Sequence, residues 1–371
     1  MVLFSSSQMK YDELHTIFKK NAITYAEYAN LITLRDIYTE TILLKRKAHF
    51  DIDEDLKKRI ATLLEQIEYY SDASHSTSFW YCHYYYMSKA TLLYINNSID
   101  ESLTLLKLVL TKWHKDIKFL RTGGEFYVEL LYMINYTGVL QGDYDYVAEA
   151  FHHPCNNLIS EAVQRANFEV IKFLALNKIY NKTARYNDVE NLIQPMKTAY
   201  QQWEPILNND LNYTTNLSIA IGCFVLEQFN DAMYFAKRAF TYFKTGTREE
   251  LSAIAQLLLL LIAYNMNSSR LFDAQYRNTY SYFYKRKKKH PFEAALVQCL
   301  HRTFYLGDSS AKIREYQKAL NVFEQNKDDV VQKMTFRIFN YPGWLKSRIQ
   351  RTSYRQYVEN MVKSGSNLVV I

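Results

Sequence analysis

The sequence predicts an all-α protein, specifically an α-solenoid of stacked antiparallel helical hairpins. Its 371 residues include 9 Gly and 5 Pro, where average usage would bring roughly 26 and 19. Apolar residues recur at spacings of three and four, which indicates amphipathic helices, and no comparable stretch shows the alternation of a strand. A short polar break also recurs at a nearly constant interval, which is typical of stacked repeats.

The breaks between helices set the expected repeat length. The bulky residue after each break recurs every 42 to 45 residues, at Ile99, Tyr144, Tyr186, Phe229, Leu271 and Ile313. An evenly apolar helix precedes each break, and an amphipathic helix follows it. Because a lone pair of helices cannot bury both of its faces, neighbouring pairs must supply the core. We therefore expect about six hairpins over residues 79–335, with a period of about 42 residues.

The two ends of the chain lie outside this register. Helical patterns over residues 11–20, 25–47 and 53–70 predict an irregular helical N-terminal cap that spans residues 1–78. The segment 336–371 follows the last repeat, and we expect it to form C-terminal capping helices and a tail.

The composition predicts a large core and a mild excess of positive charge. Hydrophobic residues make up 48% of the chain and aromatic residues 15%, with a formal net charge of +7. From Arg270 onward there are 19 basic and 8 acidic residues, so the positive charge is concentrated in the C-terminal third. An overall excess of this size does not by itself indicate a nucleic-acid-binding protein.

The most apolar segment runs from Ile254 to Tyr264 and includes five consecutive leucines, Leu257–Leu261. A membrane span needs about 20 apolar residues, so this segment predicts a buried helix. The N-terminal residues lack the pattern of a secretory signal. We expect a cytoplasmic protein with no membrane-spanning segment.

The segment from about residue 216 onward resembles a family of uncharacterised bacterial tetratricopeptide-like (TPR-like) helical repeat proteins. The residues that carry the resemblance are the stripe Ala232–Phe243, the apolar helix Leu257–Tyr264, the basic tract at 284–289 with Pro291-Phe292-Glu293, and Trp344–Ile349. The period exceeds the 34 residues of a TPR, and the usual Gly and terminal Pro are missing. The resemblance implies a helical repeat fold and an interaction role, without any activity.

No catalytic or cofactor-binding motif is present in the sequence. The sequence lacks a P-loop, the motifs GxGxxG, HExxH and GxSxG, and a paired-carboxylate motif. The one tight group of metal-type ligands is His152-His153-Pro154-Cys155, and a structural zinc site needs four ligands. We expect no catalytic residue, no metal and no cofactor, and hence a protein that is not an enzyme.

The basic tract Lys285, Arg286, Lys287, Lys288 and Lys289 is the sharpest local feature of the sequence. Cations at the end of a helix complement the negative pole of the helix dipole, which is a structural role in a solvated turn. The same cations can pair with phosphates or with an acidic protein surface. Nearby tyrosines would offer stacking surfaces to single strands where they are exposed: Tyr276, Tyr280, Tyr282 and Tyr284.

A second candidate surface follows from the repeat register. In a TPR-like array the first helix of each hairpin lines the concave face, where aromatic and cationic side chains suit peptide recognition. The register places five candidates there: Tyr84, Met87, Tyr132, Tyr136 and Lys178. A shift of one position would bury them instead.

These features favour a non-enzymatic scaffold that binds a protein or peptide partner. The alternative is a nucleic-acid-associated regulatory protein that uses its basic C-terminal third. Retention on a polyanion that depends on salt concentration would distinguish the two.

Overall fold

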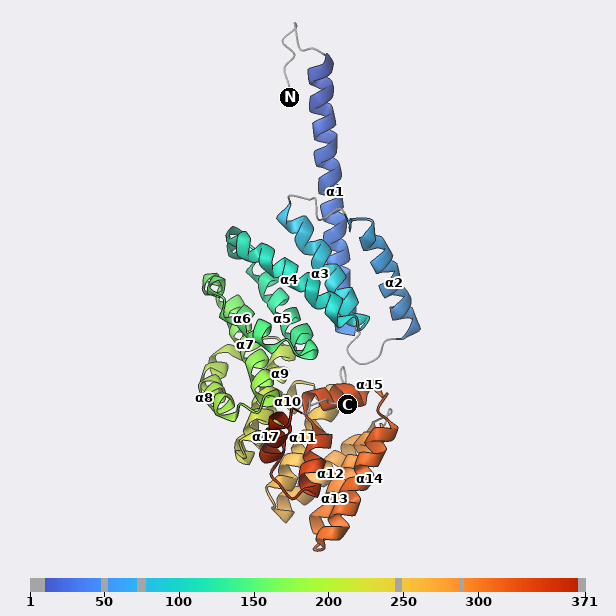
Figure 1. Cartoon of the computed structure of the whole chain (residues 1–371), viewed down its shortest axis with the longest axis vertical. Coiled ribbons are helices and arrows are strands. Elements are labelled where there is room, and N and C mark those ends of the chain that lie inside the picture. The colour runs from blue at the N-terminus through green and yellow to red at the C-terminus, as the bar shows by residue number, and fades with distance from the viewer. Residues whose placement is uncertain (1–10, 48–52, 72–77, 244–248, 287–289, 366–371) are drawn as a thin grey trace. The chain divides into compact units, whose positions relative to one another are not determined.

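The computed structural model describes residues 11–47, 53–71, 78–243, 249–286 and 290–365. Within these ranges the regular elements are helices and no residue lies in a strand, so the predicted all-α class is confirmed (Figure 1). The chain divides into two compact units, Met1–Phe119 and Leu120–Ile371. None of the described helices combines the length and the apolar composition that crossing a bilayer requires.

The described part of the first unit contains four α-helices: α1 (Tyr11–Lys47), α2 (Glu54–Glu68), α3 (Phe79–Ile95) and α4 (Ile99–Lys115). The expected break between residues 20 and 25 is absent, because α1 is continuous. Asn21 and Thr24 lie in this stretch. Each residue type disfavours a helix by only about 0.5 kcal/mol, which is too little to end one. The expected boundary at 78/79 lies inside this unit, where Tyr38 of α1 packs on Tyr84 of α3 with ring centroids 5.4 Å apart.

The second unit contains thirteen described α-helices that follow one another along the chain. Their bounds are α5 (Gly124–Gln141), α6 (Tyr144–His152), α7 (Ala162–Lys182), α8 (Tyr186–Trp203), α9 (Asn209–Val225), α10 (Phe229–Tyr242), α11 (Glu249–Asn265), α12 (Ser269–Lys285), α13 (Pro291–Tyr305), α14 (Ser309–Gln325), α15 (Val330–Ile338), α16 (Tyr341–Ile349) and α17 (Tyr354–Lys363). From α5 to α14, consecutive helices pack against each other in pairs.

The same left-handed turn ends the first helix of five pairs. The residue at this position has a positive φ at Asn97, Gly142, Ala184, Glu227 and Asn267. In the first four turns the next amide donates a hydrogen bond five residues back, for example from Arg185 to Tyr180 and from Gln228 to Cys223. This is the Schellman motif, which satisfies the carbonyls at a helix end. The breaks that look alike in the sequence therefore have a shared geometry, with one Gly among the five residues.

Small residues mark the close packing of α10 on its neighbours. Ala232, Ala236 and Ala239 are fully buried, on a helix that contacts both α9 and α11. The leucine-rich segment is also buried as expected, since every residue from Leu251 to Ala263 is buried in α11. A helix buried on all sides needs partners on each face.

The C-terminal helices supply one of those partners. The ring of Phe339, just after α15, lies 5.2 Å from that of Phe224 on α9. Trp344 on α16 lies 5.5 Å from Tyr264 on α11 and 6.2 Å from Tyr316 on α14. The sequence predicted that this segment caps the end of a repeat array; in the structure it packs along α9 and α11 through buried aromatic rings.

Candidate functional site

Three of the predicted groove residues lie together in the second unit. Tyr132 and Tyr136 lie one turn apart on α5, with ring centroids 4.8 Å apart and the Tyr132 hydroxyl donating to that of Tyr136 at 3.3 Å. The Nζ atom of Lys178, on the adjacent helix α7, lies 5.8 Å from the centroid of the Tyr136 ring. All three side chains are half-buried. The helical spacing of four residues and the packing of α5 on α7 create this group, which we call the Tyr136 cluster.

Two further cations border the Tyr136 cluster. Lys182 follows Lys178 by one turn of α7, and Arg337 on α15 is close enough to lower the pKa of both lysines by repulsion. Burial is the larger cause of both shifts, and it brings the pKa of Lys178 to about 7. The sequence did not connect Arg337 with this site, because the fold-back of the C-terminal helices brings α15 to α7.

Two of the predicted groove residues are buried in the first unit, which corrects the prediction. Met87 is fully buried and Tyr84 is 9% exposed, on helix α3. The Tyr84 ring packs between Tyr38 and Trp80, with centroids 5.4 and 5.8 Å away. Helix α3 is apolar around most of its circumference, so its side chains serve the core and do not line an open groove.

The basic tract also requires a correction at Arg286. Its side chain is 2% exposed, and Nη1 donates to Oε1 of Glu293 at 2.6 Å, with Glu249 at 3.7 Å from Nε. A buried guanidinium requires such a partner. Arg286 is therefore neither a solvated turn residue nor part of an exposed patch.

The remaining residues of the tract have different positions. Lys285 is exposed at the end of α12. Lys287, Lys288 and Lys289 lie outside the described residues.

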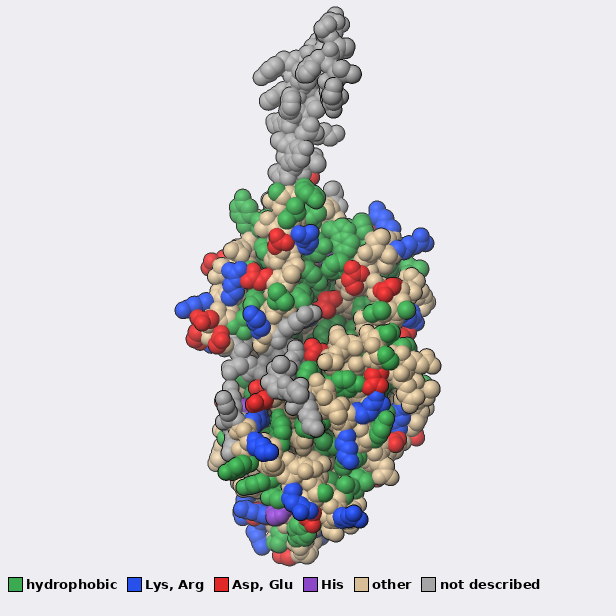
Figure 2. All heavy atoms as spheres, turned by 180° about the vertical axis from the view of Figure 1, so that it is seen from behind, with side chains coloured by type: hydrophobic (Ala, Val, Ile, Leu, Met, Phe, Trp, Pro, Cys, Tyr) green, Lys and Arg blue, Asp and Glu red, His purple; other side chains and the backbone are tan. Residues whose placement is uncertain are grey.

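An exposed row of tyrosines leads to Lys285. Tyr280 and Tyr284 are 56% and 71% exposed, with centroids 6.4 Å apart and planes at 17°. Tyr276 continues the row at 6.1 Å and stacks on His301 at 4.0 Å, so it is half-buried. Tyr282 points away, and its hydroxyl donates to the Glu249 carbonyl. On the face shown in Figure 2, basic side chains lie beside hydrophobic ones at the end of the second unit that α13 and α14 form.

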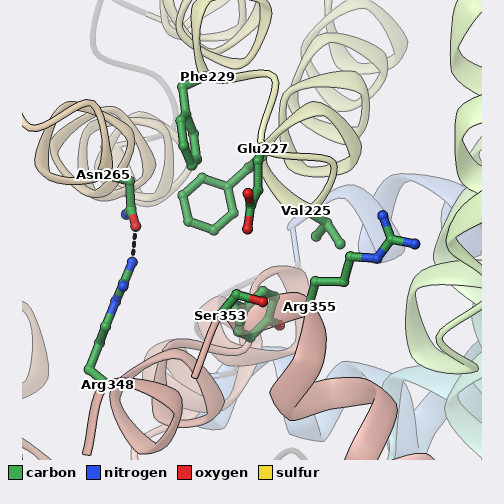
Figure 3. Close-up of a pocket in the computed structure, with 9 residues that line it drawn as sticks. Val225, Glu227, Phe229, Asn265, Arg348, Ser353 and Arg355 are labelled. Carbon is green, nitrogen blue, oxygen red and sulfur yellow. Dashed lines mark hydrogen bonds between the residues drawn. The ribbon is translucent and has the colours of Figure 1, made fainter. Parts of the chain in front are cut away.

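A small pocket lies where the C-terminal helices meet the turn between α9 and α10 (Figure 3). Glu227 and Phe229 border it from that turn, and Ser353 and Arg355 border it from the start of α17. Arg348 donates to Asn265 at its edge. Its volume of about 60 Å³ suits a few waters and is too small for a peptide side chain with its backbone.

The histidine and cysteine group after α6 forms a local turn. The amide of Cys155 donates to Nδ1 of His153 at 3.3 Å, at the start of the short 3₁₀ helix Pro154–Leu158. Nδ1 of His152 lies 2.7 Å from the Ala148 carbonyl oxygen. The two rings thus bond to separate backbone groups.

The Tyr136 cluster is the arrangement best suited to recognition. It combines two half-buried aromatic rings with the Lys178 ammonium, and two further cations, Lys182 and Arg337, border it. Aromatic faces offer apolar contact area, and ammonium and guanidinium groups bind oxyanions. No protein-family model and no curated protein sequence matches this chain.

Proposed function

We propose that this chain is a non-enzymatic scaffold that binds a protein or peptide partner on the surface of a TPR-like α-solenoid with a period of about 42 residues. The observation that carries the proposal is the Tyr136 cluster. It sets two half-buried tyrosines and the Lys178 ammonium on α5 and α7, the first helices of successive pairs. Tyrosine side chains are frequent energetic anchors of interfaces, and a lysine ammonium beside them can form a charge-assisted hydrogen bond with a carboxylate.

The recurring turn supports the repeat part of the proposal. Four first helices end with the same hydrogen bond and a left-handed residue, at Asn97, Gly142, Ala184 and Glu227. Contacts between successive first helices add to it: Asn177 of α7 donates to Ser218 of α9, and Tyr213 of α9 donates to the Leu251 carbonyl of α11. Such neighbour contacts are the stabilising interactions of a stacked array.

Overpacking one pair tests the stacking directly. Ala239→Leu adds three carbons at a fully buried position of α10, which typically destabilises by about 1–3 kcal/mol. In a stacked array, hydrogen exchange should accelerate most in the flanking pairs around Tyr186 and Leu271. Uniform acceleration over the whole second unit would contradict the solenoid.

Peptide selection tests the binding function. A random peptide library displayed on phage would be panned against the immobilised full-length chain, and enriched peptides would be synthesised. We expect Tyr136→Ala to weaken their binding by about tenfold or more, as for an interface anchor. Tyr69→Ala is the matched control, because Tyr69 is 83% exposed in the first unit. Failure to enrich any sequence, or equal binding by the Tyr136→Ala variant, would reject the proposed site.

The exposed tyrosine row beside Lys285 favours a second candidate function, association with single-stranded nucleic acid through the basic C-terminal third. Base stacking on an exposed ring contributes about 1–3 kcal/mol. If this function holds, a labelled single-stranded oligonucleotide should bind with a steep salt dependence, and Tyr280→Ala with Tyr284→Ala should weaken it. Equal binding by the double variant would exclude this row.

A further inference from the structure

Lys178, Lys182 and Arg337 form a cluster of like charge at the edge of the Tyr136 cluster. The two lysines lie four residues apart, so they share one face of α7. Arg337 comes from α15, and its repulsion acts on both lysines. Both lysine side chains are half-buried, and Arg337 is exposed. Charges of one sign thus converge from two helices that are distant in the sequence.

Lys178, Lys182 and Arg337 have no acidic partner among the described residues, whereas three other half-buried cations of the protein do. Lys89 pairs with Glu68, Lys197 with Asp231, and Arg238 with Glu204. Within the part of the chain that the structure describes, no carboxylate forms an ion pair with Lys178, Lys182 or Arg337.

This arrangement is electrostatically unfavourable in the free protein. Burial, and then repulsion by Lys182 and Arg337, lowers the pKa of Lys178 to about 7. Burial and Arg337 lower the pKa of Lys182 as well. An anion placed among the three groups would remove the repulsion and restore the charged form of the lysines. The free energy recovered in this way would favour anion binding.

The neighbouring aromatic rings restrict the kind of anion. Tyr136 lies directly beside the Lys178 ammonium, and Tyr132 extends the aromatic surface along α5. A ligand that contacts both the three cations and the two tyrosine rings needs negative groups next to an apolar side chain. An acidic peptide segment has this combination, whereas a small inorganic anion uses only the cations.

We propose that Lys178, Lys182 and Arg337 bind the carboxylates of an acidic peptide segment, while Tyr132 and Tyr136 pack against an apolar side chain of the same segment. The inference rests on the proposed scaffold function and names the chemistry of its ligand.

Binding of defined peptides to the full-length chain tests the inference. The probes are the labelled peptide Glu-Glu-Phe-Glu-Glu and its neutral counterpart Gln-Gln-Phe-Gln-Gln, followed by fluorescence anisotropy. We expect the acidic peptide to bind more tightly and to weaken with added KCl. Lys182→Gln and Arg337→Gln should each weaken it by roughly five- to tenfold, since each removes a charge-assisted contact. The matched control is Lys237→Gln, an exposed lysine of α10, which should leave the affinity unchanged.

The reactivity of the Lys178 amine provides an independent measurement. An amine with a lowered pKa is more often deprotonated near pH 7, so limited acetic anhydride should acetylate Lys178 ahead of exposed lysines such as Lys237. Mass spectrometry of peptides from α7 would follow the modification. The acidic peptide should slow acetylation of Lys178 several-fold, and the neutral peptide should not.

Each contrary result has a defined meaning. If both probes bind equally and the Gln variants behave like the wild type, the anionic ligand is wrong while the scaffold remains supported. If inorganic phosphate protects Lys178 and the acidic peptide does not, the ligand is a small anion and the inference is overturned. If neither peptide binds and library panning enriches nothing, both proposals fail. Equal weakening by Lys237→Gln would indicate a general charge effect and would also overturn the inference.

Discussion

The ring of Phe339 meets that of Phe224 edge-on, with centroids 5.2 Å apart and planes at 89°. Tyr354 of α17 packs on both rings, at 5.3 Å from Phe339 and 6.3 Å from Phe224. This aromatic trio attaches the C-terminal helices to α9. The fold-back that it stabilises also brings Arg337 near the lysines of α7.

Truncation of Phe339 should therefore release the C-terminal helices. Phe339 is 3% exposed, and Phe→Ala at a buried site typically destabilises by about 3–5 kcal/mol. Urea unfolding would measure the loss, and binding of a hydrophobic dye would report exposure of the face on α9. Val330→Ala, at a position that is 56% exposed on α15, should have little effect. A loss below about 1 kcal/mol for Phe339→Ala would show that other contacts hold these helices.

The left-handed turns predict a reciprocal pair of stability changes. Ala184 has a φ of 56°, a conformation that disfavours residues with a Cβ atom by about 1–2 kcal/mol. Ala184→Gly should raise the free energy of unfolding by about 0.5–1 kcal/mol, after the larger entropy loss of Gly on folding is subtracted. Gly142 has a φ of 84°, and a Cβ added there would meet no atom within 4 Å. Gly142→Ala should therefore be destabilising through backbone strain alone, without a steric clash. Thermal unfolding that shifts both variants in the same direction would contradict this assignment.

Neutralising Arg286 should destabilise the protein, whereas neutralising Lys285 should not. Arg286→Gln leaves the carboxylate of Glu293 buried without its guanidinium partner, and breaking a buried pair typically destabilises by about 3–5 kcal/mol. Lys285→Gln changes an exposed group that contributes little. Urea unfolding at neutral pH compares the two variants, and equal stability would mean that the ion pair is dispensable.

The effect of Arg286→Gln should also increase with pH. Burial raises the pKa of Glu293 above its usual range, and Arg286 opposes this shift. A raised carboxyl pKa means that the folded state binds its proton more tightly, so stability decreases as pH rises through this pKa. Removing Arg286 raises the pKa of Glu293 further. The loss of stability in the Arg286→Gln variant should therefore be larger at pH 7.5 than at pH 5. The double variant Arg286→Gln with Glu293→Gln should lose this pH dependence, and a constant deficit in the single variant would contradict the argument.

His83 should make the first unit sensitive to acid. The ring is buried on α3, its Nδ1 accepts a hydrogen bond from Trp113 Nε1 at 3.3 Å, and burial lowers its pKa to about 3. The unfolded chain binds a proton below pH 6.5 and the folded unit does not, so stability is full above pH 6.5 and decreases toward pH 3. This single proton corresponds to about 1.4 kcal/mol for each pH unit in that window.

The measurement is hydrogen exchange of α3 and α4 between pH 7.5 and 5, corrected for the intrinsic exchange rate. His83→Gln keeps a hydrogen-bond acceptor for Trp113 but does not titrate. The free energy of opening α3 and α4 should therefore change less with pH in this variant than in the wild type, and the difference should correspond to the uptake of about one proton. An unchanged pH dependence would show that His83 is protonated in the folded unit. The test is the slope of the opening free energy against pH. The absolute stability does not test the protonation of His83, because loss of the ring lowers it in any case.

Local chemistry in the sequence was sufficient to predict most of the helices and the recurring breaks between them, although the expected break inside α1 is absent. A helix depends on residues three and four positions apart, so stripes such as Ala232, Phe235 and Ala239 identify it without knowledge of the fold. The breaks were recognisable for the same reason. The sequence also placed Tyr132, Tyr136 and Lys178 on first helices, because helical spacing and one register decide this.

Tertiary structure decided which side chains are buried and which distant groups meet. The burial of Arg286, just after α12, depends on Glu293 and Glu249 beside it, and nothing in the basic tract itself reveals these partners. Arg337 joins Lys178 because aromatic burial folds α15 to α17 back along α9 and α11. Helix periodicity is a short-range property that the sequence determines by itself, whereas the partners of a charge or a ring depend on long-range packing, which only the folded chain fixes.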